Sequence, residues 1–130
     1  MAKKKTLTGL FLDVYGKFAA EKKTIPDEVD ELQALIDCRC FDITRRKIGG
    51  KYFDIVCDDE GLFRDKPVPS AADKNGAVML VGNLFIVRHK GADLMSLTDD
   101  DFALIQKHLR TTLADSNGSI HLSPVVICEY

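Results

Sequence analysis

Hydrophobic and polar residues alternate along several short runs of the chain, which is the pattern of strands with one buried face. Residues 6–16 form the first such run. Residues 38–48 and 51–57 form two more, and the Gly49-Gly50 pair between them is a strong signal for a two-residue hairpin turn. The pattern predicts a strand near the N-terminus and a β-hairpin in the middle of the chain.

A longer apolar run, AVMLVGNLFIVRH at residues 77–89, predicts the central strand of the sheet. It follows an Asn75-Gly76 turn signal, and Gly82 within the run predicts a β-bulge. Residues 119–130 predict a last strand. Pro124 should interrupt that strand or confine it to a sheet edge, because proline cannot donate to a hydrogen-bond ladder.

Two segments have apolar residues at helical spacing. In residues 26–37, Pro26 and several acids fall in the first turns, where a missing N–H is tolerated and negative charge is favoured. Residues 96–113 carry a second apolar stripe that extends to Leu113, and Thr98 and Asp101 have the spacing of a capping box. Residues 17–25 are polar and are expected to be a connection.

These elements predict an α+β fold with the order β-α-β-β-β-α-β. The hairpin favours a mainly antiparallel sheet of about five strands that carries two helices. Residues 1–130 are expected to form a single domain, with a flexible basic N-terminus at residues 1–5 and a C-terminal extension with the last strand at residues 112–130. An open sheet also leaves edges that need protection, so a homodimer is one expected outcome.

The composition is that of a soluble globular domain, with 45% hydrophobic and 29% charged residues. Eighteen basic and twenty acidic residues give a net charge of -2, which offers no overall attraction to nucleic acid. No apolar run is long enough to cross a membrane, and the N-terminus lacks a signal-peptide pattern. We therefore expect a cytoplasmic protein with reduced cysteines.

Two runs of three acids are the most conspicuous candidates for chemistry. One run follows the hairpin and precedes a glycine, and the other starts the second helix. Clustered carboxylates can hold Mg²⁺ or act as an acid/base pair. However, a turn and a helix start each explain such acids without catalysis. We therefore expect them to be surface acids for partner binding: Asp58, Asp59, Glu60, Asp99, Asp100 and Asp101.

The cysteines offer a weaker alternative, a metal site. Cys38, Cys40 and Cys57 are predicted to lie on neighbouring strands and could share Zn²⁺ with Cys128 or a histidine as the fourth ligand. The spacing is not that of a zinc knuckle, and buried reduced cysteines pack as small apolar residues. Packing is the preferred interpretation, and we expect no metal and no cofactor.

A short basic run, Arg45-Arg46-Lys47, alternates across the predicted strand and so splits between its two faces. With Arg64, these side chains are the candidates for binding a phosphate. The chain contains no nucleophile elbow, phosphate loop or zinc-protease motif. We therefore do not expect an enzyme.

Several stretches, in order and with similar spacing, resemble a family of small bacterial and phage proteins catalogued as domain of unknown function 3846. The resemblance covers about residues 7–110 and is carried by these segments: 30–43, 53–71, 77–87 and 95–109. Asp37-Cys38 stands where many relatives have two glycines, and Ser70 where asparagine is common. The resemblance implies a setting in phages and mobile elements, and it transfers no catalytic residue.

Three hypotheses about function follow. The first is a non-enzymatic phage or mobile-element accessory protein that binds and inhibits a host protein, such as an antiviral defence nuclease. The acids would complement a basic target surface. The second is a protein that binds or sequesters a small molecule such as a nucleotide. The third is a metal-dependent enzyme that uses the acids or the cysteines.

Overall fold

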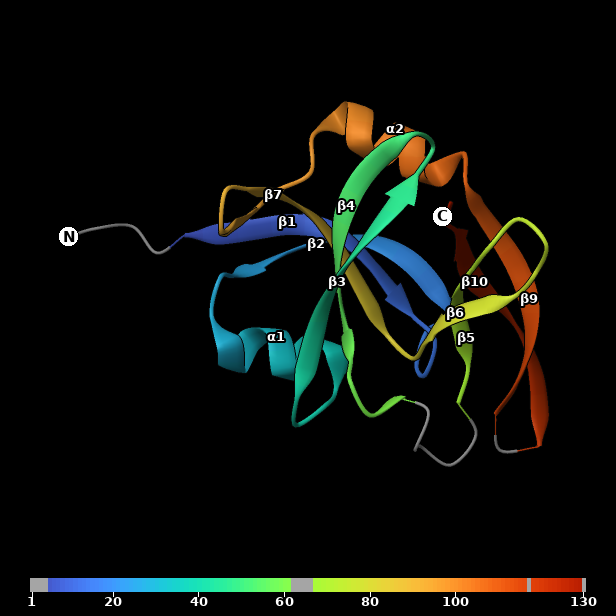
Figure 1. The fold of residues 1–130 in the computed structure, drawn as a ribbon. Coiled ribbons are helices and arrows are strands. Elements are labelled where there is room, and N and C mark those ends of the chain that lie inside the picture. The colour runs from blue at the N-terminus through green and yellow to red at the C-terminus, as the bar shows by residue number, and fades with distance from the viewer. Residues whose placement is uncertain (1–4, 62–66, 117, 130) are drawn as a thin grey trace.

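The computed structural model describes residues 5–61, 67–116 and 118–129 (Figure 1). Within them lie ten strands and two helices, in the order β-β-α-β-β-β-β-β-β-α-β-β. The elements are β1 (Thr6–Asp13), β2 (Ala19–Pro26), α1 (Val29–Ile36), β3 (Phe41–Ile48), β4 (Lys51–Asp58), β5 (Pro69–Ala72), β6 (Val78–Val81), β7 (Leu84–Lys90), β8 (Asp93–Met95), α2 (Asp99–Gln106), β9 (Leu109–Ser116) and β10 (Ser119–Ile127). The predicted flexible segment at residues 1–5 falls outside this range except for Lys5.

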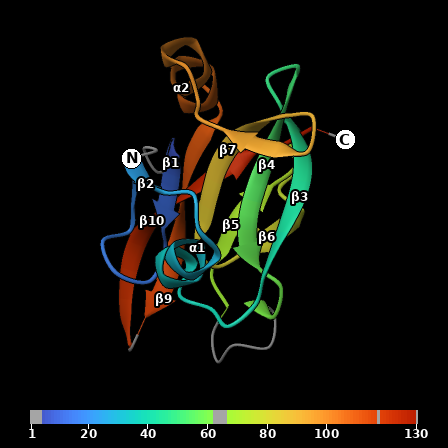
Figure 2. The ribbon, with the colours of Figure 1, turned by 90° about the vertical axis from the view of Figure 1, so that its left-hand side faces the viewer.

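The strands form two sheets (Figures 1 and 2). Sheet A has the order β2-β1-β7-β4-β3, with β8 also paired to β7, and sheet B has the order β6-β5-β10-β9. All pairs are antiparallel except that of β5 with β10. The α+β class is therefore confirmed, but the described strands are twice the predicted five.

Two layers of apolar packing cover the two faces of sheet A. On one face, Ile55 and Ile86 pack in a core cluster with Val126 of sheet B and Ile105 of α2. On the other face, Phe85 packs in a second cluster with Leu32 and Ile36 of α1, among others. Sheet A is thus the middle layer, and Figure 1 shows α1 to the left of β3 and β4 and the strands of sheet B to their right.

Strand β7 lies at the centre of this arrangement. Leu84, Phe85, Ile86 and Val87 are all fully buried, because Leu84 and Ile86 face sheet B while Phe85 and Val87 face α1. A strand buried on both faces is apolar at every position, which is the pattern that predicted a central strand here.

The prediction of one continuous strand over residues 77–89 was wrong, because the run is divided between the two sheets. Gly82 has a φ of +84°, and its N–H donates to the Val68 carbonyl at 2.8 Å. The next residue, Asn83, accepts a hydrogen bond from the Val14 N–H at 2.9 Å. The chain therefore turns at Gly82, a conformation that glycine adopts without strain, and passes from β6 in sheet B to β7 in sheet A.

The predicted boundaries of both helices were also wrong. Pro26 ends β2 instead of beginning a helix, and the polar residues before it pair with β1 along an edge strand. The second helix ends at Gln106, although its predicted capping box is present. Residues 109–116 instead pair with β10 along their whole length, because a long-range ladder outweighs a local helical stripe.

The last strand is continuous, so the predicted interruption at Pro124 does not occur. Pro124 lies opposite Thr111 in β9, and β10 is an interior strand of sheet B. Strand β5 pairs with β10 only at Val126 and Ile127. On the side of β10 that faces β5, no strand therefore needs a backbone N–H from Pro124, and the proline is tolerated. No helix in the described part of the chain is long and apolar enough to cross a membrane.

Gly9 allows the close approach of β1 to β7, and it provides a test of this packing. A Cβ atom at this position would clash with the Ile86 carbonyl oxygen and lie 2.8 Å from a Val87 methyl. We expect Gly9→Ala to lower the free energy of unfolding by about 1–3 kcal/mol in urea denaturation, because the overpacked core must shift. Lys90→Ala, at the exposed end of β7, should change it by about 0.5 kcal/mol or less. Equal stability of the Gly9→Ala variant and the wild type would contradict this packing.

Candidate functional site

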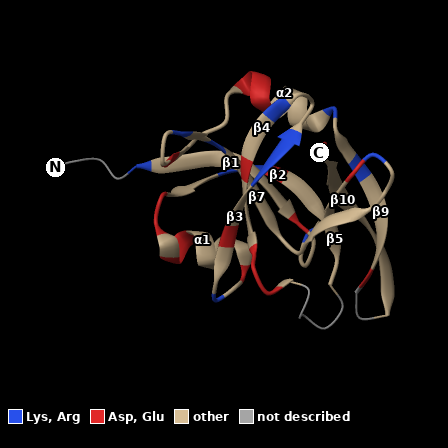
Figure 3. Cartoon of the chain, viewed as in Figure 1, with Lys and Arg blue, Asp and Glu red and all other residues tan. Residues whose placement is uncertain are grey.

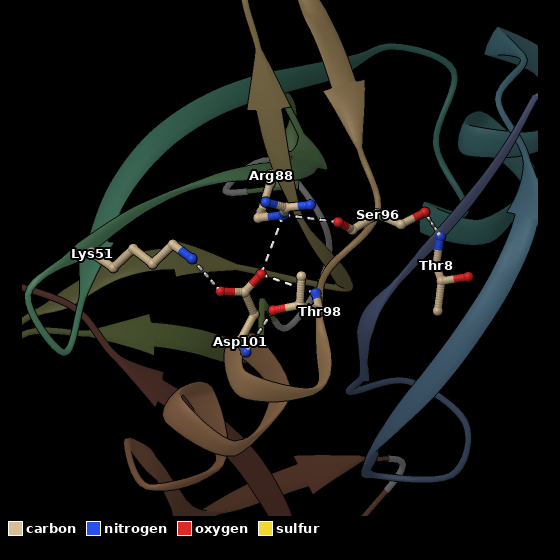
Figure 4. Close-up of polar contacts among 6 residues, drawn as sticks. All are labelled: Thr8, Lys51, Arg88, Ser96, Thr98 and Asp101. Carbon is tan, nitrogen blue, oxygen red and sulfur yellow. Dashed lines mark hydrogen bonds and ion pairs between the residues drawn. The ribbon is translucent and has the colours of Figure 1, made fainter.

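The acids at the start of α2 do not all face solvent. Asp101 is 1% exposed, and both of its carboxylate oxygens are engaged (Figure 4). Oδ1 accepts from Lys51 Nζ at 2.5 Å, Oδ2 accepts from the Thr98 N–H at 2.9 Å, and Arg88 Nε lies 3.2 Å from Oδ2 in an ion pair. The predicted role of Asp101 as a surface acid for a partner is therefore wrong, whereas Asp99 and Asp100 are exposed.

The same network joins α2 to sheet A. Arg88 on β7 also donates to the Ser96 carbonyl at 2.9 Å, and the Ser96 hydroxyl accepts from the Thr8 N–H on β1 at 2.9 Å (Figure 4). Burial alone would raise the pKa of Asp101, but the hydrogen bonds from Lys51 and Thr98 outweigh it and leave the pKa lowered. Asp101 is thus an ionised structural anchor.

The acids that follow β4 lie at the other end of that strand. Strand β4 begins at Lys51, which contacts Asp101, and ends at Asp58. About 23 Å of extended strand therefore separates the two acidic clusters. The Asp58 carboxylate accepts the Glu60 N–H at 2.9 Å, which closes the predicted turn. The Asp59 N–H donates to the Cys40 carbonyl at 3.3 Å and ties this turn to the segment before β3.

Two adjoining open grooves share Asp58. One, of about 530 Å³, lies between the end of α1 and the turn after β4, and the other, of about 350 Å³, lies between that turn and β6. Five acids line these grooves, and together we call them the acidic rim: Asp37, Asp42, Asp58, Asp59 and Glu60. Among the described lining residues the one cation is Arg39, whose guanidinium lies 3.8 Å from Glu60.

Figure 3 shows that acidic and basic residues are separated along β3 and β4. Acidic residues gather near α1 and the turn that follows β4, whereas the far end of β3 is basic. The acidic rim is therefore a local surface that the net charge of -2 does not reveal.

The predicted basic run splits between the two faces of β3, as the alternation indicated. Arg45 lies opposite Asp54 and Lys47 lies opposite Tyr52, both on the face that α1 partly covers, whereas Arg46 is on the face toward sheet B. The structure therefore does not bring the three cations together. Arg64, the fourth candidate, lies outside the described residues.

Sequence reasoning missed a polar cluster on the face of sheet A that α1 partly covers, which we call the outer face. Asp54 is buried, and its Oδ1 lies 3.3 Å from Arg45 Nε and 3.3 Å from His89 Nδ1. Lys47 Nζ lies 5.9 Å from the centre of the Tyr52 ring, and that tyrosine is 57% exposed. The two-residue hairpin at Gly49-Gly50 fixes Arg45 opposite Asp54, so that pair could have been read from the sequence. The position of His89 could not.

The cysteines do not form the alternative metal site. Cys57 belongs to the core cluster between the two sheets, whereas Cys38 packs on the opposite face of sheet A beside α1. No group of three or more histidine, cysteine, aspartate or glutamate side chains suits a metal ion within the described residues. Burial raises the pKa of both Cys57 and Cys128 to about 11, so these two thiols pack as neutral side chains at neutral pH.

Replacement of Asp101 tests the anchor between α2 and sheet A. We expect Asp101→Asn to lower the free energy of unfolding by about 2–3 kcal/mol near neutral pH, because it removes the charge that Lys51 and Arg88 share and weakens the helix cap. Asp100→Asn, in the same turn but exposed, is the control and should change it by about 0.5 kcal/mol or less.

The effect of Asp101 should also depend on pH in a defined direction. The folded-state pKa lies below the ordinary value of 3.8, so the unfolded chain takes up the proton first as the pH falls. The stabilisation by Asp101 is present above that value and is lost as the pH falls through the folded-state pKa. Urea denaturation across this range should show the wild type and Asp101→Asn converging in stability. A constant difference at all pH values would contradict the assignment.

Comparison with known proteins gives a family but no function. The family model described as Domain of unknown function (DUF3846) matches residues 9–110, a range that begins within β1 and ends at the start of β9. No curated protein and no solved structure matches this chain. Because the match spans more than half of the sequence, the chain belongs to the family of the Domain of unknown function (DUF3846).

Proposed function

We propose that this protein is a small non-enzymatic accessory protein that binds and inhibits a host protein through its acidic rim. The observation that carries the proposal is the convergence of five carboxylates on two adjoining open grooves at one end of sheet A. Like charges gathered on one surface repel one another, and a partner of opposite charge relieves that repulsion on binding.

The chemistry of the acidic rim specifies the partner. Carboxylates held by a turn and by the neighbouring ends of α1 and β3 present a fixed row of acceptors for lysine and arginine side chains. Such side chains are abundant on proteins that bind nucleic acid. The resemblance noted above implies a phage or mobile-element setting. In that setting the proposed target is a nucleic-acid-handling host protein in the cytoplasm, such as a defence nuclease.

The burial of the core supports binding by contact. Apolar side chains cover much of both faces of sheet A, and the acids of the acidic rim lie outside these core clusters, near the ends of α1, β3 and β4. Within the acidic rim, the Asp58 carboxylate already accepts a backbone N–H, and Glu60 is near Arg39. These contacts hold the acids in place on the surface, which favours a docking role.

Paired neutralisation of acids tests the proposal with a defined probe. We expect Asp59→Asn with Glu60→Gln to weaken binding of a lysine- and arginine-rich peptide about tenfold in fluorescence anisotropy. Asp99→Asn with Asp100→Asn removes the same number of exposed charges from α2 and should leave the affinity nearly unchanged. Equal weakening by the two double variants would mean that only the total charge matters and would overturn the assignment to the acidic rim.

A second experiment tests inhibition itself. The tagged protein, purified from its host cell, should retain a basic partner that the Asp59→Asn, Glu60→Gln variant loses. If the retained partner is a nuclease, an excess of the wild-type protein should suppress cleavage, and the variant should not. Unchanged nuclease activity with an excess of the wild type would reject the inhibitory role.

The outer face of sheet A favours a second candidate, the binding of a nucleotide. Arg45 is held beside Asp54, and Lys47, which lies 3.8 Å from the Glu129 carboxylate, is beside an exposed aromatic ring, so two cations for a phosphate and a surface for a base occur together. The predicted phosphate candidates Arg45 and Lys47 are part of this cluster.

Thermal-shift measurements with linear and cyclic nucleotides separate this second candidate from the first. We expect any stabilising nucleotide to lose its effect in a Tyr52→Ala, Arg45→Gln variant, because stacking and the phosphate contact are both removed. Arg110→Gln, an exposed cation on β9, serves as the control. If no nucleotide raises the melting temperature of the wild type, the candidate is rejected.

A further inference from the structure

The outer face of the β9–β10 hairpin exposes large apolar side chains. Leu113 on β9 is 68% exposed, and Ile120 and Leu122 on β10 are 71% and 65% exposed. Leu113 and Leu122 are directly opposite in the hairpin register, and Ile120 lies two residues along the same face. The three side chains therefore form one continuous surface, which we call the apolar stripe. Exposed apolar surface of this kind marks sites of association.

The same hairpin lies at an edge of its sheet. Strand β9 is at the end of sheet B and pairs only with β10 among the described strands. It is eight residues long and contains neither lysine nor proline, and its charged residues are Arg110 and Asp115, near its two ends. The other long edge strands, β2 and β3, carry lysines, and β6 has only four residues. Lysine, proline and short length are the usual protections of a sheet edge, so β9 is the described edge best suited to accept another strand.

We propose that a second copy of this chain pairs along β9, antiparallel to the first, about a two-fold axis at Leu113. If the two-fold axis is perpendicular to the sheet, the two copies of β9 join into one continuous sheet. Each residue of β9 must then pair with a residue of the partner strand whose side chain points to the same face of that sheet. Leu113, one of the two residues at the middle of β9, satisfies this condition when it pairs with Leu113 of the partner subunit. This register uses nearly the full length of the strand.

Side-chain chemistry in this register is self-complementary. The apolar stripe continues across the junction as a row of four leucines, Leu122 and Leu113 of each subunit, and neighbours in such a row shield one another from water. Asp115 lies opposite Thr111 of the partner subunit, whose hydroxyl can donate to the carboxylate. No like charges face each other directly among the described side chains of β9. These features favour a second copy over an unrelated strand.

Sedimentation velocity of the full chain tests the proposed dimer. The wild type should sediment as a dimer at micromolar concentrations, and Leu113→Lys should sediment as a monomer, because two ammonium groups would meet at the two-fold axis. Val78→Lys, at an exposed apolar position on the opposite edge of sheet B, is the matched control and should remain dimeric. A monomeric wild type, or a Leu113→Lys variant that remains a dimer, would overturn the proposal.

Disulfide trapping provides a test that does not require the lysine variant to fold. A Leu113→Cys variant should form an intersubunit disulfide on mild oxidation, because residues directly opposite in paired strands have Cα atoms at the separation that a disulfide needs. Val78→Cys and the wild type, which retain the native cysteines, give the background. If the Leu113→Cys variant forms an intersubunit disulfide no faster than this background, any dimer contact lies elsewhere and the β9 register is rejected. This outcome is independent of binding at the acidic rim.

Discussion

The burial of strand β7 on both of its faces is the constraint on which the rest of the structure depends. Residues from Leu84 to Val87 contribute alternately to two separate core clusters, so sheet A must be covered by sheet B on one side and by α1 on the other. The turn at Gly82 delivers the chain into this strand from the other sheet. Because the interior of sheet A is apolar, the polar groups available for recognition lie at the ends of strands, on the uncovered part of the outer face, and at the sheet edges.

The two acidic runs show how position within this frame decides the role of a carboxylate. Asp101 lies in the first turn of α2, within reach of Lys51 at the start of β4 and of Arg88 on β7, and there it stabilises the contact between helix and sheet. Asp58 ends the same strand, beyond the covered part of sheet A, and belongs to a surface on which acids outnumber cations among the described residues. An aspartate at one end of β4 therefore joins a helix to the sheet, whereas the aspartate at the other end belongs to the surface that we propose as the docking site.

Features that depend on neighbouring residues could be predicted from the sequence, and features that depend on long-range pairing could not. The hairpin at Gly49-Gly50 and the capping box of Thr98 are local and are present in the structure. Strands β2 and β9 were not predicted, because an edge strand gains its stability from backbone pairing with a distant partner and needs no apolar alternation. The acidic turn of the candidate site depends on neighbouring residues and was predicted. The burial of Asp101 depends on contacts with β4 and β7, which are distant in the sequence, and was not predicted.

The proposed function requires binding of a partner at the acidic rim. The most direct measurement is a titration of the isotope-labelled protein with its purified basic partner, or with an arginine-rich peptide, followed by two-dimensional NMR of the backbone amides. The account predicts that the shifted resonances belong to the turn after β4, to the start of β3 and to the end of α1, with little change in α2. Shifts confined to α2 or to the outer face beside Tyr52 would contradict it.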